Sequence, residues 1–424
     1  MNTVPHDSKP VHNSRQMRGR DPNETHRVAT PLELLFDLTF ATAFGLAASQ
    51  FAQALAGGNY AAAFVGFGYA SFAICWAWVN FSWFASAYDT DDWIFRLATM
   101  VQMTGVLVVA IGLPRLFASI EHGTHLDNKF MVLGYVIMRI AMVFQWLRAA
   151  KQDPIRRRSC LTYAVTISIA QFGWVLQILV GFPPIAVVVS SVILLIIEFS
   201  GPLLAERKSN GTPWNANHIA ERYSCFAIIA LGEGVVGTVA ALSAEVDLKG
   251  WTLDAALVCL SGVGLTFGLW WLYYLVPSAE ELQANRNRAF VWGFGQMMAV
   301  VSIVAIGAGL RVAASFIAGK AHIGALAAVL TVAIPVTIYI GSVYALYYYL
   351  IRRFDRYHAP LLIGTVVVVA VALVAALSHV NVAVCLAILV LAPVVTIVGY
   401  EVVTTRHAGH SSSGSSEREA SRAE

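Results

Sequence analysis

The sequence predicts an all-α integral membrane protein of about twelve transmembrane helices, arranged as two parallel six-helix repeats. Two observations predict the fold class. Hydrophobic residues make up 58% of the 424 residues and charged residues only 12%, whereas a soluble domain is about 25% charged. Apolar runs of about 20 residues recur along almost the whole chain, and each can cross a hydrocarbon core about 30 Å thick. Lipid is therefore the expected solvent for most of this chain.

Glycines, prolines and charged clusters separate the apolar runs and mark where each helix begins and ends. The runs are too long and too uniformly apolar for barrel strands, which are about 10 residues long and alternate in polarity. We expect membrane helices near residues 32–55, 60–86, 94–114, 130–149, 160–180, 185–205, 218–243, 251–277, 289–317, 322–351, 360–378 and 381–400.

The distribution of Lys and Arg predicts the orientation, because short loops rich in these residues stay in the cytoplasm. With a cytoplasmic N-terminus, 21 of the 28 Lys and Arg residues fall in cytoplasmic segments, four fall outside and three fall within helices. One span too many or too few would remove this bias, so it supports the helix count as well. We expect both termini in the cytoplasm, with residues 1–29 and 404–424 as disordered polar tails.

The two halves of the chain resemble one another, which predicts one repeat at residues 30–206 and a second at 207–403. Glu33 and Glu221 each lie near the start of a long helix, 188 residues apart, and Gln102 and Gln296 open similar segments 194 residues apart. Six helices is an even number, so the two repeats would share one orientation, as in transporters with parallel repeats.

The helix near 32–55 begins with a capping signal followed by a deeper carboxylate. Thr30 is the expected N-cap, Pro31 occupies the first helical position, and Glu33 completes a capping box three residues after the cap. Asp37 lies one turn further along the same face, about 6 Å deeper at 1.5 Å per residue. It is too deep to cap the helix, so we interpret it as an ion-paired or pathway carboxylate.

The helix near 218–243 carries a second set of charged groups. His218, Arg222 and Glu233 lie close to one face, because 11 residues return a helix to within about 20° of its starting direction. Glu233 lies between glycines that permit close helix packing or local unwinding. Two interpretations stay open: a packing notch in which Glu233 bonds to a neighbouring helix, or a proton or cation site.

Arg139 lies about ten residues into its helix and needs a carboxylate, since a guanidinium stays charged at ordinary pH. Glu198 is expected at a comparable depth, so Arg139 and Glu198 form our predicted structural ion pair, with Glu233 or Asp37 as competing partners. Aromatic residues late in the second and eighth helices, Trp76 and Trp78 among them, are typical of an interfacial belt, and an aromatic wall for a substrate is the alternative.

Composition and motifs argue against several classes of function. The formal net charge of +3 is too small to indicate nucleic-acid binding, and the five cysteines are scattered without disulfide or zinc spacing. The sequence shows no P-loop, no Gly-x-Ser-x-Gly elbow, no His-Glu-x-x-His pair and no dinucleotide fingerprint. We therefore expect no enzymatic activity, no catalytic residue, no metal, no cofactor and no nucleic-acid partner.

Two segments, "TPLELLFDLTFATAFG" and "HIAERYSCFAIIALGEG", resemble the bacterial low temperature requirement A family of multi-spanning membrane proteins. The resemblance extends from about residue 27 to 403 and departs from the usual pattern at Thr39, Thr42 and Gly234. It implies a bacterial plasma membrane location and brings no established substrate. The residues that match the family are Glu33, Phe36, Asp37, His218, Glu221, Arg222, Gly232 and Glu233.

These features together predict a secondary transporter or permease for a small solute or ion, with proton coupling as one form of it. Asp37 and Glu233 would bind the proton or cation, and Arg222, His218 and Glu221 would lie along the pathway, with Arg222 and His218 at its cytoplasmic mouth. A passive cation channel, or a membrane sensor or scaffold needed for growth at low temperature, are the alternatives. The expected partners are the lipid bilayer and the solute, and a homo-oligomer is compatible with the sequence.

Overall fold

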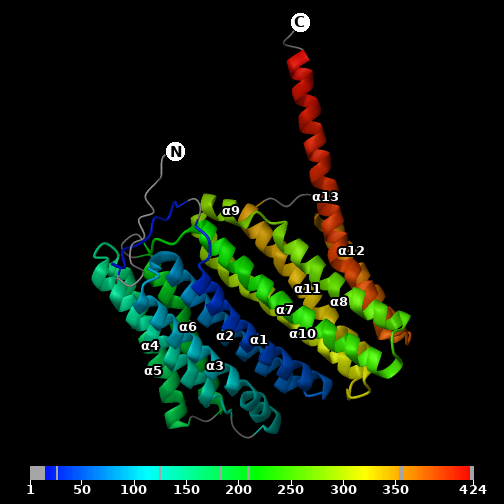
Figure 1. Cartoon of the computed structure of the whole chain (residues 1–424), viewed down its shortest axis with the longest axis horizontal. Coiled ribbons are helices and arrows are strands. Elements are labelled where there is room, and N and C mark those ends of the chain that lie inside the picture. Colours follow the sequence, from blue (N-terminus) through cyan, green and yellow to red (C-terminus); the bar gives the residue numbers. More distant parts are fainter. Residues whose placement is uncertain are drawn as a thin grey trace, which may run out of the picture. The chain divides into compact units, whose positions relative to one another are not determined.

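The computed structural model describes residues 15–24, 27–123, 126–181, 184–207, 211–352 and 358–420, and beyond Glu401 it describes only the backbone. Within these ranges the regular structure is helical, without strands (Figure 1). Twelve of the described helices are long and apolar enough to cross a membrane, which confirms the predicted all-α, multi-pass class.

The helices run close to their expected positions. Their bounds are α1 Pro31–Ala56, α2 Tyr60–Tyr88, α3 Trp93–His122, α4 Lys129–Gln152, α5 Arg157–Val180, α6 Pro184–Glu206, α7 Ala216–Lys249, α8 Leu253–Tyr274, α9 Ser278–Ala284, α10 Ala289–Ile317, α11 Ala325–Ile351, α12 His358–Leu377 and α13 Val382–Ala420, with a 3-10 turn η1 at Arg286–Arg288.

Helices α3 and α13 continue furthest past their expected ends. Helix α3 passes through Pro114 and stops at Gly123, whose left-handed backbone (φ 67°) lets its N–H bond to the carbonyl of Ser119. The sequence predicts disorder from residue 404, yet α13 continues to Ala420. A helix that is already nucleated in a membrane span propagates without forming a new nucleus.

The chain divides into two compact units. Unit 1 comprises Met1–Ala47 and Gly68–Cys225, and unit 2 comprises Ala48–Phe67 and Phe226–Glu424. The first turns of α7 therefore belong to unit 1, although the sequence places the boundary between residues 206 and 207. Their side chains pair with α1, as described below. The arrangement as two six-helix repeats stays a prediction.

The described part of the N-terminal segment packs onto unit 1, so the prediction of a disordered tail through residue 29 is wrong for residues 15–24 and 27–29. Met17 is completely buried, and Arg148 donates to the carbonyl of Arg15 at 2.9 Å. Asn215 donates to the carbonyl of Glu24 at 2.9 Å. The polar composition of this segment suggested that it is solvated. Instead, its backbone carbonyls accept hydrogen bonds from buried Arg and Asn side chains.

In unit 1, α3 packs on α4, α4 on α5 and α5 on α6 (Figure 1), and aromatic rings fill much of the interior. Phe36 of α1 lies 3.8 Å from Phe81 of α2 between ring centroids, and Trp146 of α4 stacks on Tyr163 of α5 at 4.2 Å. Lipid tails are as apolar as these side chains, so dispersion in close packing, more than release of water, holds such helices together.

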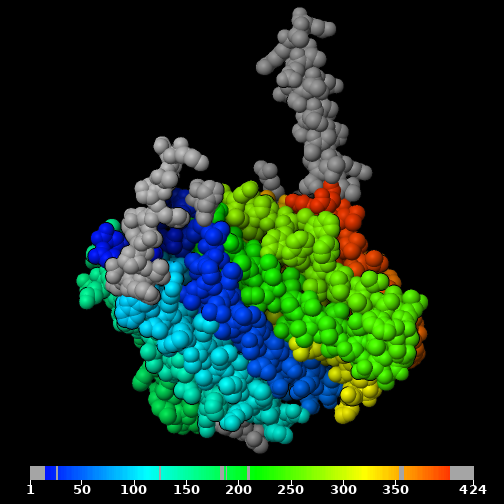
Figure 2. Space-filling model, viewed as in Figure 1, coloured from blue at the N-terminus to red at the C-terminus, as the bar shows by residue number. Residues whose placement is uncertain are grey.

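The outward faces of the spans are apolar, as lipid requires. Helix α3 forms part of the surface shown in Figure 2 (cyan), and it exposes Leu97, Met100 and Ile111 at 48%, 54% and 63%. A soluble protein would place charged or polar side chains on such a face. The exposed apolar positions therefore agree with a helix whose outer side contacts acyl chains.

Unit 2 packs through small residues. An added Cβ at Gly307 of α10 would lie 2.5 Å from the backbone carbonyl oxygen of Glu233, and one at Gly309 would lie 2.4 Å from that of Thr331 in α11. Neither backbone can yield to such contacts, so glycine is needed where α10 crosses α7 and α11.

Candidate functional site

The start of α1 forms the expected capping box. Thr30 N–H donates to Glu33 Oε2 at 2.8 Å, and Glu33 N–H donates to Thr30 Oγ1 at 3.3 Å. Pro31 stands at the first helical position, where its missing N–H costs nothing. This geometry fixes the direction in which the Glu33 side chain leaves the helix.

Glu33 has a second contact that its capping role does not explain. Its Oε2 lies 3.2 Å from His218 Nε2, and both side chains are completely buried. His218 is held in place because Asn215, which precedes α7, accepts the His218 backbone N–H at 3.0 Å. This bond has the geometry of an N-cap to the third helical residue. The capping elements of α1 and α7 thus bring an acid and a histidine together.

One turn along both helices, Asp37 meets Arg222. Arg222 Nη1 donates to Asp37 Oδ2 at 2.9 Å, and Nη2 donates to Oδ1 at 2.7 Å, which is a bidentate pair. Trp78 Nε1 also donates to Asp37 Oδ1 at 2.7 Å, and Ser82 Oγ accepts from Arg222 at 3.3 Å. Both charged side chains are completely buried.

These two contacts form one four-residue cluster, which we call the α1–α7 charge cluster: Glu33, Asp37, His218 and Arg222. The acids are four residues apart on α1, and the bases are four residues apart on α7, so each pair lies on one helix face. Arg222 Nε lies 3.9 Å from Glu33 Oε1 and links the two contacts. The bases follow the acids in the same order, so α1 and this part of α7 run in the same direction.

The charge balance of the cluster depends on one proton. Arg222 offsets one carboxylate, so the cluster carries one net negative charge when His218 is neutral and none when it is protonated. Two further groups lie close to the cluster and have opposite charges: Arg27, which donates to the carbonyl of Ala85 at 2.7 Å, and Asp89. A net charge buried in low dielectric is costly, so the protonation state matters here.

Both neighbouring groups lie outside the spans and feel their burial. Desolvation lowers the pKa of Arg27 to about 10, which still leaves it charged. Desolvation, with the nearby Glu33 carboxylate, raises the pKa of Asp89 to about 6. Glu221 of α7 is half-buried and interacts with the backbone N–H of Ala29, at the edge of the cluster.

The structure encloses Arg222 and His218, and their expected place at the cytoplasmic mouth of a pathway stays a prediction. Neither side chain has any exposed surface. Each was expected near the inner surface because it lies early in its helix, but α1 and the N-terminal segment pack around that region of unit 1. Asp37 is equally enclosed.

Glu233 belongs to unit 2, where it pairs with Arg311 of α10 at 2.6 Å. Its side chain is 10% exposed and that of Arg311 is 22% exposed. Our sequence interpretation did not name Arg311 as the partner. An intramembrane guanidinium without an assigned carboxylate was the signal that could have identified it.

Arg139 and Glu198 lie in contact in unit 1, with Arg139 Nη2 donating to Glu198 Oε2 at 3.1 Å and both side chains 4% exposed. Asp37 and Glu233, the competing partners, are each held by another arginine. Trp76 Nε1 donates to Glu198 Oε2 at 2.7 Å. Trp76 and Trp78 are thus buried hydrogen-bond donors, and their assignment to an interfacial belt is wrong.

Known proteins offer a comparison once this geometry is established. A family model described as bacterial low temperature requirement A protein matches residues 28–393. The chain belongs to the bacterial low temperature requirement A family. As a member of this family it resembles an uncharacterized protein of Rhizobium meliloti (strain 1021), with 24% identity over 302 residues that cover 67% of this chain and 69% of that protein. No solved structure matches.

Within this family member, the matched range includes the whole α1–α7 charge cluster as well as Glu233 and Arg311. The described residues contain no group of three or more His, Cys, Asp or Glu side chains that could hold a metal ion. The α1–α7 charge cluster consists of acids paired with bases, and such groups can exchange protons.

Proposed function

We propose that this chain is a proton-coupled secondary transporter or permease for a small solute in the bacterial plasma membrane, with both termini in the cytoplasm. The observation that carries the proposal is the α1–α7 charge cluster. Four ionisable side chains lie completely buried in spans where a charged group costs at least about 2.5 kcal/mol to insert. Two ionisable side chains, one on each helix, would be enough to link α1 to α7, so packing alone does not account for four.

The imbalance within the cluster supports proton exchange. Two acids face one permanent cation, and His218 is the member that titrates near neutral pH when unperturbed. Its Nδ1 has no hydrogen-bond partner among the described residues. A proton shared between His218 and Glu33 would move the cluster between a neutral state and a state with one negative charge, and the charged state favours a rearrangement that readmits water or solute.

Glu233 and Arg311 enter the proposal as a second exchange point in unit 2. This pair is partly exposed, unlike the completely buried Asp37–Arg222 pair. The Glu233 carboxylate is therefore less enclosed than that of Asp37. Arg139 and Glu198 are nearly inaccessible, and Glu198 also accepts from Trp76. We therefore assign this pair to stabilising unit 1.

A passive cation channel receives less support from these contacts. One kind of cation filter in a membrane is a ring of carboxylates, whose oxygens must not already be neutralised. Asp37, Glu198 and Glu233 each contact an arginine at 3.1 Å or less. A sensor or scaffold would use the same contacts without any transport, and flux measurements separate it from a transporter.

The test uses the full-length protein in proteoliposomes that contain a pH-sensitive dye. An inward proton gradient is imposed, and a fraction of small molecules below 1 kDa from a bacterial extract is added as the solute source. We expect solute-dependent proton entry for the wild type and at least a tenfold loss for His218→Gln, which cannot take up the proton. Glu33→Gln keeps the capping box and loses only the acid, so it should lose flux as well.

The matched control is Glu198→Gln, which removes a buried paired carboxylate of unit 1 outside the cluster. Its flux per folded molecule should stay near that of the wild type, with folding checked by size-exclusion chromatography. Solute-independent flux in the wild type would indicate a channel. Absence of flux in the wild type would favour a sensor or scaffold, and unchanged flux in folded His218→Gln would remove the cluster from the mechanism.

A further inference from the structure

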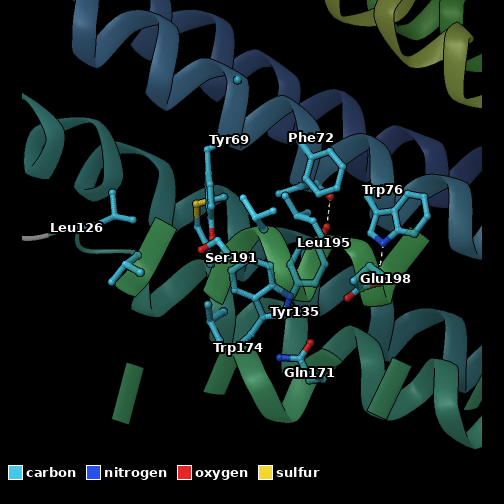
Figure 3. A pocket seen from close by; sticks show the side chains of 16 residues that line it. Tyr69, Phe72, Trp76, Leu126, Tyr135, Gln171, Trp174, Ser191, Leu195 and Glu198 are labelled. Atoms are coloured by element: carbon cyan, nitrogen blue, oxygen red, sulfur yellow. Dashed lines mark hydrogen bonds between the residues drawn. The ribbon is translucent and has the colours of Figure 1, made fainter. Parts of the chain in front are cut away.

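Unit 1 contains a cavity that is separate from the α1–α7 charge cluster. Its volume is about 420 Å³, and residues of α2, α4, α5 and α6 line it, together with Leu126 before α4. Figure 3 shows the rings of Tyr69, Phe72 and Trp76 on α2 facing Tyr135 and Trp174 on α4 and α5. Five aromatic side chains around one space are typical of a site for a flat, apolar molecule.

Most polar groups on the cavity wall already have partners. The Tyr135 hydroxyl donates to the carbonyl of Ala73. Trp76 Nε1 donates to Glu198, and Tyr69 Oη accepts from Asn128 at 3.3 Å. These contacts are intramolecular and need no ligand.

Gln171 differs from these groups. Its side chain lies on the cavity wall (Figure 3) and the residue is only 9% exposed. Neither its amide nitrogen nor its amide oxygen has a hydrogen-bond partner among the described residues. A buried amide left unpaired on both atoms costs about 1–3 kcal/mol for each group. The terminal torsion of glutamine is broad, so the amide can turn toward an occupant.

The charge on the wall identifies the class of ligand. Glu198 is the acidic residue of the lining, and Arg139 neutralises it at 3.1 Å. The cavity therefore offers no net charge to a ligand. With its one acidic group already paired, the lining would hold an organic cation through cation–π contact with the rings alone, and an organic anion would need a free arginine.

We propose that this cavity binds a neutral, planar aromatic molecule carrying an amide-like group, which donates one hydrogen bond to Gln171 and accepts another from it. The two amides would pair in a ring, as each has one donor and one acceptor on the same edge. The proposal concerns binding, and it does not depend on the transport proposed above.

The volume sets the size of the ligand. An apolar cavity of about 150 Å³ accommodates benzene, so about 420 Å³ has room for two or three rings. A lipid acyl chain would fill part of the same space, but it would leave both Gln171 groups unpaired and would not use the planes of the five rings. We therefore favour an aromatic amide over a lipid tail.

The test compares 2-naphthamide with naphthalene, which has the same rings and lacks the amide. Both are titrated calorimetrically into the full-length protein in lipid nanodiscs. We expect saturable binding of 2-naphthamide to the wild type and a loss of about tenfold in affinity for Gln171→Leu, which corresponds to about 1.4 kcal/mol. Naphthalene should bind more weakly and equally to both proteins.

A second variant fills the cavity without disturbing the fold. Gly68 lines the cavity, and an added Cβ there would meet no heavy atom within 4 Å, so Gly68→Trp should abolish binding of both probes. Gly341 of α11 in unit 2 is equally unobstructed, and Gly341→Trp should leave binding unchanged. Gln296→Leu, at another buried glutamine with an unpaired amide oxygen, is the matched control for Gln171→Leu.

Three results would overturn the proposal. One is unchanged 2-naphthamide affinity in folded Gln171→Leu. Another is binding that Gly68→Trp does not reduce, since this would be partition into lipid. The third is displacement of 2-naphthamide by decanamide with equal affinity, or by choline, since these would assign the cavity to a lipid chain or to an organic cation.

Discussion

The Asp37–Arg222 pair permits a quantitative test of how the α1–α7 charge cluster is held together. Replacing Arg222 by Met leaves Asp37 buried, with only the Trp78 indole still donating to it at 2.7 Å. Removing one partner of a buried pair costs about 3–5 kcal/mol, because the other charge is left uncompensated. Asp37→Leu should cost a similar amount, toward the lower end, because Glu33 stays 3.9 Å from Arg222.

The double variant Asp37→Leu with Arg222→Met should lose less stability than the sum of the losses in the two single variants. No uncompensated charge from the pair remains, and the main residual cost is the unpaired Trp78 N–H, about 1–3 kcal/mol. The two single changes would sum to about 6–10 kcal/mol, so the coupling energy should be about 3 kcal/mol or more. Close charge pairs elsewhere show couplings of about 1.5–7 kcal/mol.

The assay is reversible unfolding of the four proteins in mixed micelles of increasing SDS content, followed by far-ultraviolet circular dichroism. The double-mutant cycle isolates the pair from effects that each substitution has elsewhere. Solvent-exposed ion pairs contribute less than about 1 kcal/mol. A coupling energy in that range would therefore refute the reasoning. The pair would then behave as if it were hydrated.

Three further predictions concern other parts of the chain and use the same unfolding assay. Gly307→Ala should destabilise unit 2 by about 1–3 kcal/mol through the clash with the Glu233 backbone, whereas Gly341→Ala should stabilise it by about 0.5–1 kcal/mol; equal effects would refute the close helix crossing. Burial raises the pKa of Asp89 to about 6, so the folded state binds this proton more tightly than the unfolded state and stability should fall as pH rises from about 4 to 6, by up to about 3 kcal/mol. In Asp89→Asn this component of the pH dependence should vanish, and its persistence would assign the titration to another group. Arg139→Met should cost about 3–5 kcal/mol by leaving its carboxylate partner in α6 buried and uncompensated; a cost below about 1 kcal/mol would show that water reaches the pair.

The sequence was sufficient for the helical spans because length and apolarity determine them locally. A run of about 20 apolar residues has few alternatives in lipid, where every backbone group must be bonded within the segment. Helix ends were less predictable. Pro114 suggested a stop that the structure does not make, since a proline in a membrane helix is tolerated when neighbours satisfy the freed carbonyl.

The sequence indicated which charged residues matter and could not assign all their partners. Arg139 and Glu198 could be matched by depth, because two spans of predicted direction place both near the middle of the membrane. Asp37 and Arg222 are 185 residues apart, and their contact depends on how α1 packs against α7. Helical periodicity places a residue on a face, but the packing of helices decides what that face meets.

The aromatic residues show the same limit. Trp76 and Trp78 occupy positions where an interfacial belt is common, and only the contacts with Glu198 and Asp37 show that both indoles are buried donors. In lipid, a buried carboxylate uses every nearby donor that packing allows. The sequence does not specify that choice of donor.

Proton flux in the Asp37→Leu, Arg222→Met double variant tests most directly whether the cluster acts in transport or only in stability. The cycle above predicts that this variant stays folded, so its flux is not confounded by loss of structure. We expect solute-dependent proton entry at least tenfold below the wild type in proteoliposomes holding equal amounts of folded protein. Wild-type flux in that variant would contradict the account and leave the pair with a purely structural role.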